Sequence, residues 1–545
     1  MQMRSGHFIF ILFLVFNCLA GCRSHRISVI RDREYEILRA DGRSVQEAFS
    51  RSHRYLLGWL AQADSATGLI PRNLRESRDF WNAWDAGADN YPFMVLTAAI
   101  LDSARFQGVC RDMLKTEQRL SSRIGRLPDN YSFSRRGFQF DSVDLNRVIF
   151  GTAEYMKDGL IPLTEWLGPS PWSDRMLGML ADLPKVARRA TDIRGNWYGN
   201  SATVEVNGDL LQVLSRMYWF TRDTTLRDWV FELADHYLGT DGRLPTDALD
   251  RLRIRDHGCE IISGLCEAYI VAVHTDPVRR ALWKPRIHRM LDRILEVGRN
   301  ADGLFYDEVD PHSGKVLSSR IADNFGYTFN AYWHIGAIDA KPAYQAAVRQ
   351  GLASLSLNYT DHNWENGSAD GDADAVEGAL NLYRRTPTDA LAGWIDHQIR
   401  TMWQKQQADG VIEGWHGDGN FARTSLMYAL WKTRGVTPVG WREDLRLSAQ
   451  MIKQGVRVMV AADSAWSGRL RFDIARHKQY MHMPVDYPRI NQFPEWFTVD
   501  PSKQYRVHNR MTREASIYLG SDLSRGVPVS LNAGTEMLLD ISAIN

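Results

Sequence analysis

The sequence predicts a mainly α-helical protein: an (α/α)6 or (α/α)7 toroid of helical hairpins followed by a small C-terminal β-sandwich-like domain. From about residue 46 to 450, apolar residues recur at helical spacing. Apolar segments alternate with more charged ones, and the apolar segments start 46–66 residues apart, a period typical of stacked supersecondary units. After about residue 446, short β-branched segments are separated by Gly, Pro, Asp and Ser.

The N-terminus has the pattern of a signal peptide over residues 1–21. Residues 8–16, FIFILFLVF, are apolar throughout and too short to span a bilayer. The sequence Leu19-Ala20-Gly21-Cys22 resembles a bacterial lipobox, which implies cleavage before Cys22 and a lipid on its sulfur. Because Arg and not Asp follows that cysteine, the resemblance implies the outer membrane of a Gram-negative envelope. Residues 22–40 are then expected to be a linker.

The helical domain is expected to span residues 41–445. In each pair, the first segment forms the inner helix and often opens with an acid. The inner segments start near Asp89, Asp144, Glu205, Asp256, Ala322, Asp372 and Asp418, and their partners lie near 109–124, 172–190, 224–238, 279–297, 341–355 and 387–404. A helix over 46–62 is expected to pair with the last inner helix and close the ring. One such start is a helix cap; seven starts of this kind, six of them at an acid, predict a rim lined with carboxylates.

The last domain is expected to span residues 446–545. Strands are predicted at GVRVMVAAD, LRFDIARH, SIYLG and GTEMLLDIS. A helical ring followed by a β-sandwich resembles the six-hairpin glycosidase superfamily. The stretches WENGSADGDADAVEG (364–378) and EGWHGDGNFAR (413–423) look like the rim loops of such enzymes. The resemblance implies a carbohydrate-active enzyme, either a glycoside hydrolase of a bacterial lipoprotein type or a polysaccharide lyase, although seven hairpins are counted here.

Several other function classes have no support in the sequence. The 66 Lys and Arg balance 65 Asp and Glu, so no nucleic-acid partner is expected. A zinc-type Cys/His set, HExxH, a P-loop and a GxSxG elbow are all absent from the sequence. No cofactor is expected. The run from Asp370 to Glu377 has acids at relative positions 1, 3 and 5 but lacks the other EF-hand positions, which leaves a non-EF calcium site as a minor alternative.

Glycosidic bonds are cleaved by two carboxyl groups that converge in a cleft. Four rim acids are the candidates for this chemistry. Glu365 lies between a Trp and a Gly-bearing turn, and Glu413 lies in a loop rich in Gly and aromatics. Glu205 opens an inner helix after NWYG, and Asp89 lies in WNAWDAGADNY. For each of them the alternative is a helix cap or a buried ion pair.

Polar and aromatic side chains beside these acids are expected to bind a sugar by hydrogen bonding and stacking. The candidates are Asp85, Tyr91, Arg255, His257, Asn324, Tyr327, Trp364, Asp370, Trp415 and His416. A lyase would use Tyr91, Tyr327, His257 or His416 as the base, and Arg255 or Asn324 to neutralise a uronate. A glycan-binding lipoprotein without activity is the third possibility. The abundance of rim carboxylates favours hydrolysis of oligo- or polysaccharides, including those with uronic acids.

Overall fold

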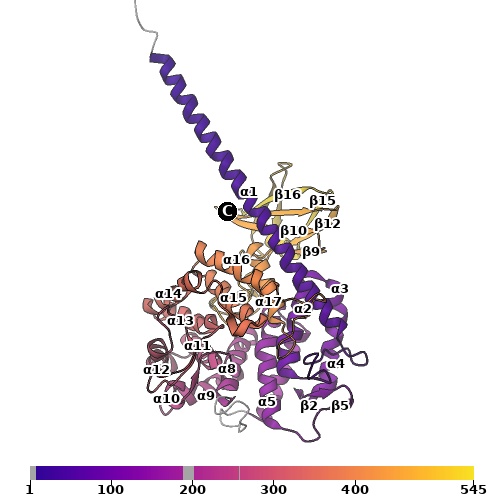
Figure 1. The fold of residues 1–545 in the computed structure, drawn as a ribbon, viewed down its shortest axis with the longest axis vertical. Helices are drawn as coiled ribbons and strands as arrows, with labels where there is room; N and C mark the ends of the chain where they lie inside the picture. The colour runs from indigo at the N-terminus through magenta and orange to yellow at the C-terminus, as the bar shows by residue number, and fades with distance from the viewer. Residues whose placement is uncertain (1–7, 188–201, 257, 545) are drawn as a thin grey trace, which may run out of the picture.

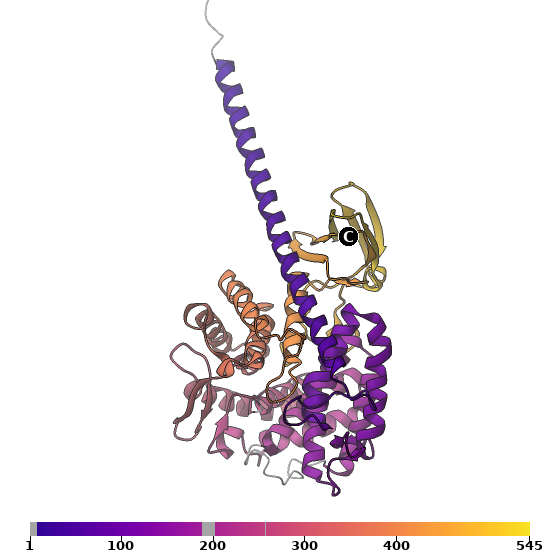
Figure 2. The same ribbon diagram turned by 45° about the vertical axis from the view of Figure 1, so that its right-hand side comes forward.

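The protein consists of a ring of helices and a C-terminal β-sandwich, both of which contact one long N-terminal helix, α1 (Phe8–Ala61) (Figures 1 and 2). The computed structural model describes residues 8–187, 202–256 and 258–544, and within them side chains from residue 33 onward except 202 and 203. Within this described part of the chain, no helix is both long and apolar enough to cross a membrane. The expected linker, residues 22–40, lies within α1.

Seven inner segments form the ring. They are α2 (Tyr91–Leu101) with the preceding η1 (Ala83–Asn90), α5 (Leu145–Glu154) with the following η3 (Tyr155–Leu160), α8 (Ala202–Thr221), α11 (Gly258–Thr275), α13 (Phe325–Ile338), α15 (Ala369–Tyr383) and α17 (Asn420–Lys432). Each contacts the next, and α17 contacts α2, so the ring closes. The toroid is confirmed, and over the described residues it has seven inner segments, the larger of the two predicted sizes.

The outer helices cover this ring. They are α4 (Arg111–Ser121), α7 (Pro171–Asp182), α9 (Thr224–Leu238), α12 (Pro277–Val297), α14 (Pro342–Asn358) and α16 (Asp389–Trp403), and the end of α1 packs on α17 as expected. Burial distinguishes the two layers. All residues of α17 are buried, whereas α16 buries one apolar stripe that includes Leu391, Trp394 and Ile395. An amphipathic helix suits the outer layer and an apolar helix suits the inner one.

Short elements connect the hairpins. The helical ones are α3 (Ser103–Arg105), η2 (Phe106–Cys110), α6 (Ile161–Leu167), η4 (Leu183–Lys185), α10 (Pro245–Ala248) and η5 (Trp364–Gly367). The strands are β1 (Phe80–Trp81), β2 (Ser122–Ile124), β3 (Leu127–Pro128), β4 (Tyr131–Ser132), β5 (Gly137–Phe138), β6 (Leu252–Arg253), β7 (Tyr306–Val309) and β8 (Val316–Ile321). Strands β6, β7 and β8 form a small antiparallel sheet just before α11 and α13.

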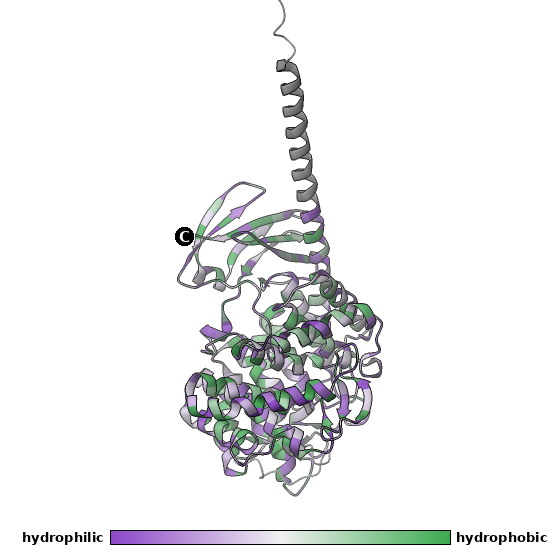
Figure 3. Ribbon diagram, turned by 90° about the vertical axis from the view of Figure 1, so that its left-hand side faces the viewer, coloured by the Kyte–Doolittle hydropathy of each residue, from purple (hydrophilic) through white to green (hydrophobic). Residues whose placement is uncertain are grey.

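The sandwich has two antiparallel sheets. The larger has the order β10 (Leu445–Ile452), β11 (Gly455–Ala462), β16 (Glu536–Ala543), β13 (Gln504–Asn509), β14 (Ala515–Leu519), and the smaller has β15 (Val527–Leu531), β12 (Trp466–Arg471), β9 (Thr437–Val439). Alternate residues such as Val456, Val458 and Val460 fill the space between the sheets. Helix α1 lies along the other face of the larger sheet (Figure 3), where Leu38 packs on Met459.

The boundary between the domains differs from the prediction. The sandwich begins at β9, and the expected boundary at residue 446 falls inside β10. Strand β12 ends at Arg471, so the second half of LRFDIARH is not a strand; it leads into α18 (Arg476–Gln479). A further helix, α19 (Gly520–Arg525), precedes β15.

The chain leaves the sandwich between β12 and β13, over residues 472–503, which we call the insertion loop. Apolar side chains of this loop, including Met483, Tyr487 and Phe493, belong to the core of the helical ring. Deep in the ring, Arg489 Nε lies 3.0 Å from both carboxylate oxygens of Glu165 on α6. Because seven hairpins enclose a wider centre than six, the ring needs this extra filling to reach the packing density of a protein interior.

Candidate functional site

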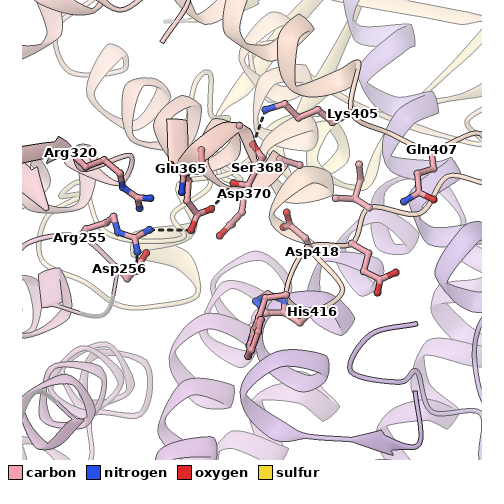
Figure 4. Close-up of a pocket in the computed structure, with 17 residues that line it drawn as sticks. Arg255, Asp256, Arg320, Glu365, Ser368, Asp370, Lys405, Gln407, His416 and Asp418 are labelled. Atoms are coloured by element: carbon pink, nitrogen blue, oxygen red, sulfur yellow. Dashed lines mark hydrogen bonds and ion pairs between the residues drawn. The ribbon is translucent and has the colours of Figure 1, made fainter. Parts of the chain in front are cut away.

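A cavity of about 700 Å³ opens at the N-terminal ends of α11, α15 and α17 (Figure 4). Its lining residues are Arg255, Asp256, Arg320, Glu365, Asn366, Gly367, Ser368, Ala369, Asp370, Lys405, Gln407, Ile412, Glu413, Gly414, Trp415, His416 and Asp418. The sequence brings these residues together because the loops before successive inner helices emerge at the same end of the ring. The positive ends of the helix dipoles stabilise anionic groups there.

Glu365 stands on a strained turn. Glu365 and Asn366 have positive φ values of 44° and 55°, conformations that cost non-glycine residues about 1–2 kcal/mol each. Arg255 Nη1 donates to Glu365 Oε1 at 3.1 Å, and the Ser368 hydroxyl donates to Oε2 at 2.5 Å. Such strain recurs at functional sites, where the surrounding contacts hold a side chain in one orientation. Here it directs an ion-paired carboxylate into the cavity, as Figure 4 shows.

Two further carboxyl groups, Asp370 and Asp418, flank Glu365 in the cavity. Burial raises the pKa of Asp418 to about 6, with Asp374 and Glu365 adding to the rise and His416 opposing it. Burial also raises the pKa of Asp370 well above its usual range, and the nearby Asp418 adds to this effect. Carboxyl groups that cannot all ionise together provide both a proton donor and a proton acceptor.

His416 connects the cavity to η1. Its Nε2 lies 3.8 Å from Asp85 Oδ1 and 3.7 Å from Asp89 Oδ2, and its Nδ1 lies 3.0 Å from the Gly417 carbonyl oxygen. Burial by itself would lower the pKa of His416, but the two carboxylates outweigh it and raise that pKa. Burial raises the pKa of Asp89 to about 7. Ligand atoms of Asp85, Asp89 and His416 all lie within 4.8 Å of one another, a set that could hold a metal ion.

Trp415 presents an aromatic face at the cavity. Its side chain is 70% exposed, and its ring stacks 5.0 Å from the Arg72 guanidinium carbon. The loop that carries it is fixed to the segment before η1: Asn73 Nδ2 donates to the Trp415 carbonyl at 2.9 Å, and Glu413 Oε1 accepts from the Leu74 amide at 2.9 Å. The exposed ring is therefore held rigidly rather than packed away, as a stacking platform for a sugar requires.

Behind the cavity lies a buried polar network. The Tyr327 hydroxyl lies 2.9 Å from Asp374 Oδ1 and 2.8 Å from Glu377 Oε2. Arg423 Nη2 lies 2.8 Å and 2.9 Å from the same two carboxylates. Burial raises the pKa of Glu377 to about 7 against the opposing effect of Arg423. Tyr327 is thus buried among carboxylates, and its raised pKa makes it a poor base.

The structure places several sequence candidates in or beside one cavity. Glu365, Glu413, Arg255, Asp370, Trp415 and His416 line it, and Asp85 and Asp89 face His416. Asp85 also accepts 2.5 Å hydrogen bonds from Arg72 Nε and Asn82 Nδ2, which fix its orientation. The acids of the suggested calcium run do not gather at one point: Asp372 pairs with Lys405, while Asp374 and Glu377 pair with Arg423.

Other candidates lie away from this cavity. Trp364 is fully buried against Phe325 and Trp394, so its ring has no face for a sugar. Tyr91 is buried, and its hydroxyl donates to the Cys110 carbonyl.

Four further positions are either buried or outside the described residues. Glu205 is buried in the first turn of α8 beside a separate small cavity. Asn324 is buried at the start of α13, where Nδ2 lies 3.6 Å from Cys259 Sγ. His257 and the side chain of Cys22 lie outside the described residues.

Sequence reasoning missed two cationic residues of the cavity, Arg320 and Lys405. Arg320 comes from the end of β8, a strand inserted in a helical pattern, and Lys405 follows the last turn of α16. Neither residue lies in a sequence motif that predicts a binding or catalytic site. Asp418 was part of a quoted rim loop, but only its raised pKa in the fold distinguishes it from a helix cap.

The ring and the sandwich confirm the architecture implied by the resemblance to the six-hairpin glycosidases, with seven inner segments among the described residues. No protein-family model and no curated protein matches the chain. Solved structures similar to part of it include cellobiose 2-epimerase from Bacillus thermoamylovorans B4167 (TM-score 0.39, 13% identity, 52% of this chain and 87% of that one). Another is a possible GH105 family member from Salmonella enterica (TM-score 0.39, 12% identity, 52% and 81%). A third is an inactive variant of the α-1,6-mannanase GH76A of Salegentibacter sp. HEL1_6 with α-1,6-mannotetrose (TM-score 0.39, 11% identity, 70% and 97%).

Proposed function

We propose that this protein is a glycoside hydrolase acting on oligo- or polysaccharides at the cavity described above. The observation that carries the proposal is the convergence of Glu365, Asp370 and Asp418 in one cavity beside the exposed ring of Trp415. Carboxyl groups in unlike environments supply the acid and the base that glycosidic cleavage needs. The exposed indole offers the apolar face on which a sugar ring stacks.

In this proposal Asp418 donates the proton to the glycosidic oxygen. A pKa of about 6 lets it be protonated before the reaction and reprotonated after each turnover. Glu365, held by Arg255 and Ser368, attacks the anomeric carbon or activates the water that does so. Burial raises the pKa of Asp370 well above its usual range, and we assign this carboxyl group to binding a sugar hydroxyl.

We also propose that uronic acids are among the sugars bound. The support is the pair of guanidinium groups, Arg255 and Arg320, on one wall of the cavity (Figure 4). Guanidinium groups bind carboxylates with good geometry. Both already contact Asp307, at 3.5 Å and 2.9 Å, which would hold them in place for a substrate.

The test is to incubate residues 23–545 with neutral and uronic-acid glycans and to record new reducing ends together with ultraviolet absorbance. Hydrolysis predicts reducing ends without absorbance. Absorbance rising in step with reducing ends would mean β-elimination and would replace this proposal with a lyase. If neither reducing ends nor absorbance appear but glycans still bind, the protein is a glycan-binding protein without hydrolase activity.

We propose further that the mature chain is anchored by lipid at Cys22, in the outer membrane of a Gram-negative bacterium. The support is the order of apolar residues 8–16 and Leu19-Ala20-Gly21-Cys22. Labelled palmitate should enter the expressed wild type and not the Cys22→Ser variant. Equal labelling of both would refute the anchor.

A further inference from the structure

Asn491 of the insertion loop lies among buried and partly buried acids at the centre of the ring. We call this group, which includes Asp158 and Glu377, the acidic centre. Asn491 Nδ2 donates to Asp158 Oδ1 at 2.7 Å, and Asn491 Oδ1 accepts from Arg423 Nη1 at 2.7 Å. The Asn491 backbone amide donates to Glu377 Oε1 at 2.7 Å. Asn491 is buried, so its contacts with Arg423 and Glu377 are shielded from water, while Asp158 is partly exposed.

Asn491 holds this position in a strained conformation. Its φ is 59°, in the left-handed region that asparagine tolerates better than most residues. The preceding Ile490 is clamped between Cys259 on α11 and Tyr327 on α13, and its carbonyl accepts from Arg216. The loop is thus fixed at Ile490, directly before Asn491, whose side chain and backbone amide both contact residues of the ring.

A chain of hydrogen bonds leads from Asn491 to the cavity. Arg423 Nη1, which donates to Asn491, also donates to Asn420 Oδ1 at 2.8 Å. The side-chain Nδ2 of Asn420 in turn donates to Asp370 Oδ1 at 2.7 Å, and the Asn420 backbone amide donates to Asp418 Oδ1 at 3.1 Å. The orientation of the Asp370 carboxyl group therefore depends on side chains that Asn491 holds. Asp418 accepts from the Asn420 backbone instead, and it is influenced by Arg423 through charge, because the Arg423 guanidinium lowers the pKa of Asp418.

We propose that Asn491 is a positioning residue through which the C-terminal domain holds the Asp370 carboxyl group in place and sets the position of the Arg423 charge near Asp418. The side-chain amide of Asn491 lies between Asp158 and Arg423, and it keeps the Arg423 guanidinium aligned with Asn420 and Asp374. The proposal rests on the function proposed above, because its main readout is hydrolysis. Asn491 does not line the cavity itself, so it acts through Arg423 and Asn420.

The variant Asn491→Gly tests this. Glycine adopts the left-handed conformation freely, so the backbone can stay while the side chain is lost. On a glycan that the wild type hydrolyses, we expect kcat to fall about 10- to 100-fold, because a displaced Arg423 changes the charge beside the proton donor Asp418. KM should rise about two- to tenfold, because Asp370 binds a sugar hydroxyl and loses its fixed orientation.

Gln492→Ala is the matched control. Gln492 is the next buried amide of the same loop, but its Nε2 donates to Asp486, away from the acidic centre. Its kcat should stay within about twofold of wild type. An unchanged kcat in Asn491→Gly, or an equal loss in Gln492→Ala, would overturn the proposal.

A second measurement needs no substrate and separates this proposal from the function. In Asn491→Asp, a new buried carboxylate lies between Asp158 and Arg423. Burial and Asp158 raise its pKa and Arg423 lowers it. Glu377, buried beside the same Arg423, has its pKa raised to about 7, so we expect the new carboxyl group also to have a folded-state pKa above the unfolded value of about 3.9. A raised carboxylate pKa costs stability as pH rises above the unfolded value, so Tm should fall below that of Asn491→Gly increasingly between about pH 4 and pH 7. A Tm difference independent of pH would overturn the positioning role even if the wild type hydrolyses glycans. The expected fall in Tm without any hydrolysis would refute only the function.

Discussion

Trp364 and Trp415 both occur in acid-rich rim sequences, yet only one has a free face. Trp415 is 70% exposed, whereas Trp364 is fully buried. Replacing Trp415 by Ala should raise KM about two- to tenfold, the size of one aromatic contact, and leave Tm unchanged. Replacing Trp364 by Ala should cost about 3–5 kcal/mol of stability. Thermal unfolding and glycan titration of the two variants would check this, and equal losses of stability would contradict it.

His416 controls the proton affinity of its acidic neighbours. It lowers the pKa of Asp418, which is about 6 in the wild type. The rate should therefore fall as pH rises through this value, because Asp418 loses the proton that it donates. In His416→Asn the lowering effect is removed, so the alkaline limb should move to higher pH. A pH–rate profile with the limb unchanged, or moved to lower pH, would exclude Asp418 as the donor.

Among the elements, the insertion loop places a buried charge, Arg489, in the ring. Arg489 forms a buried ion pair with Glu165, which also lies 3.5 Å from Arg216. In Arg489→Met this carboxylate loses its main partner, which should cost about 3–5 kcal/mol in urea unfolding.

Arg251→Met is the control, because Arg251 pairs with Glu308 at the surface. Surface pairs contribute little, so the urea midpoint of this variant should not change. If Arg489→Met left the midpoint equally unchanged, the loop would not be part of the ring core.

The elements also show what the sequence could predict. The inner helices and most outer helices agree with the prediction within a few residues, because helical periodicity and capping are local; Asp144, for example, caps α5 through the amides of Asn146 and Arg147. Two outer helices differ more: α1 begins at Phe8 and not near residue 46, and α7 ends at Asp182 and not near residue 190. The insertion loop was not predicted. Its contacts join residues as far apart as Glu165 and Arg489, and they leave no local pattern in either segment. Arg320 and Asn491 escape prediction for the same reason, because their roles depend on partners far away in the sequence.

At the scale of the whole molecule, α1 and the insertion loop pack the two domains against each other. The insertion loop buries Tyr487 and Phe493 in the ring, and α1 packs Leu38 on the sandwich and Trp59 in the ring. Calorimetry should therefore show one unfolding transition for residues 23–545, since α1 packs on both domains and the insertion loop completes the core of the ring. Two separable transitions would mean that the sandwich folds independently of the ring.

The central claim is that carboxyl groups of the cavity cleave glycosidic bonds, and Glu365→Gln tests it most directly. The amide keeps the size of the side chain but removes the charge that attacks carbon or activates water. On a glycan that the wild type hydrolyses, kcat should fall about 10²- to 10⁴-fold while glycan binding is retained. The control is Asp361→Asn, a change at an exposed carboxylate, which should have the kcat of the wild type. Retention of kcat by Glu365→Gln within about twofold would contradict the assignment of the cavity as the catalytic site.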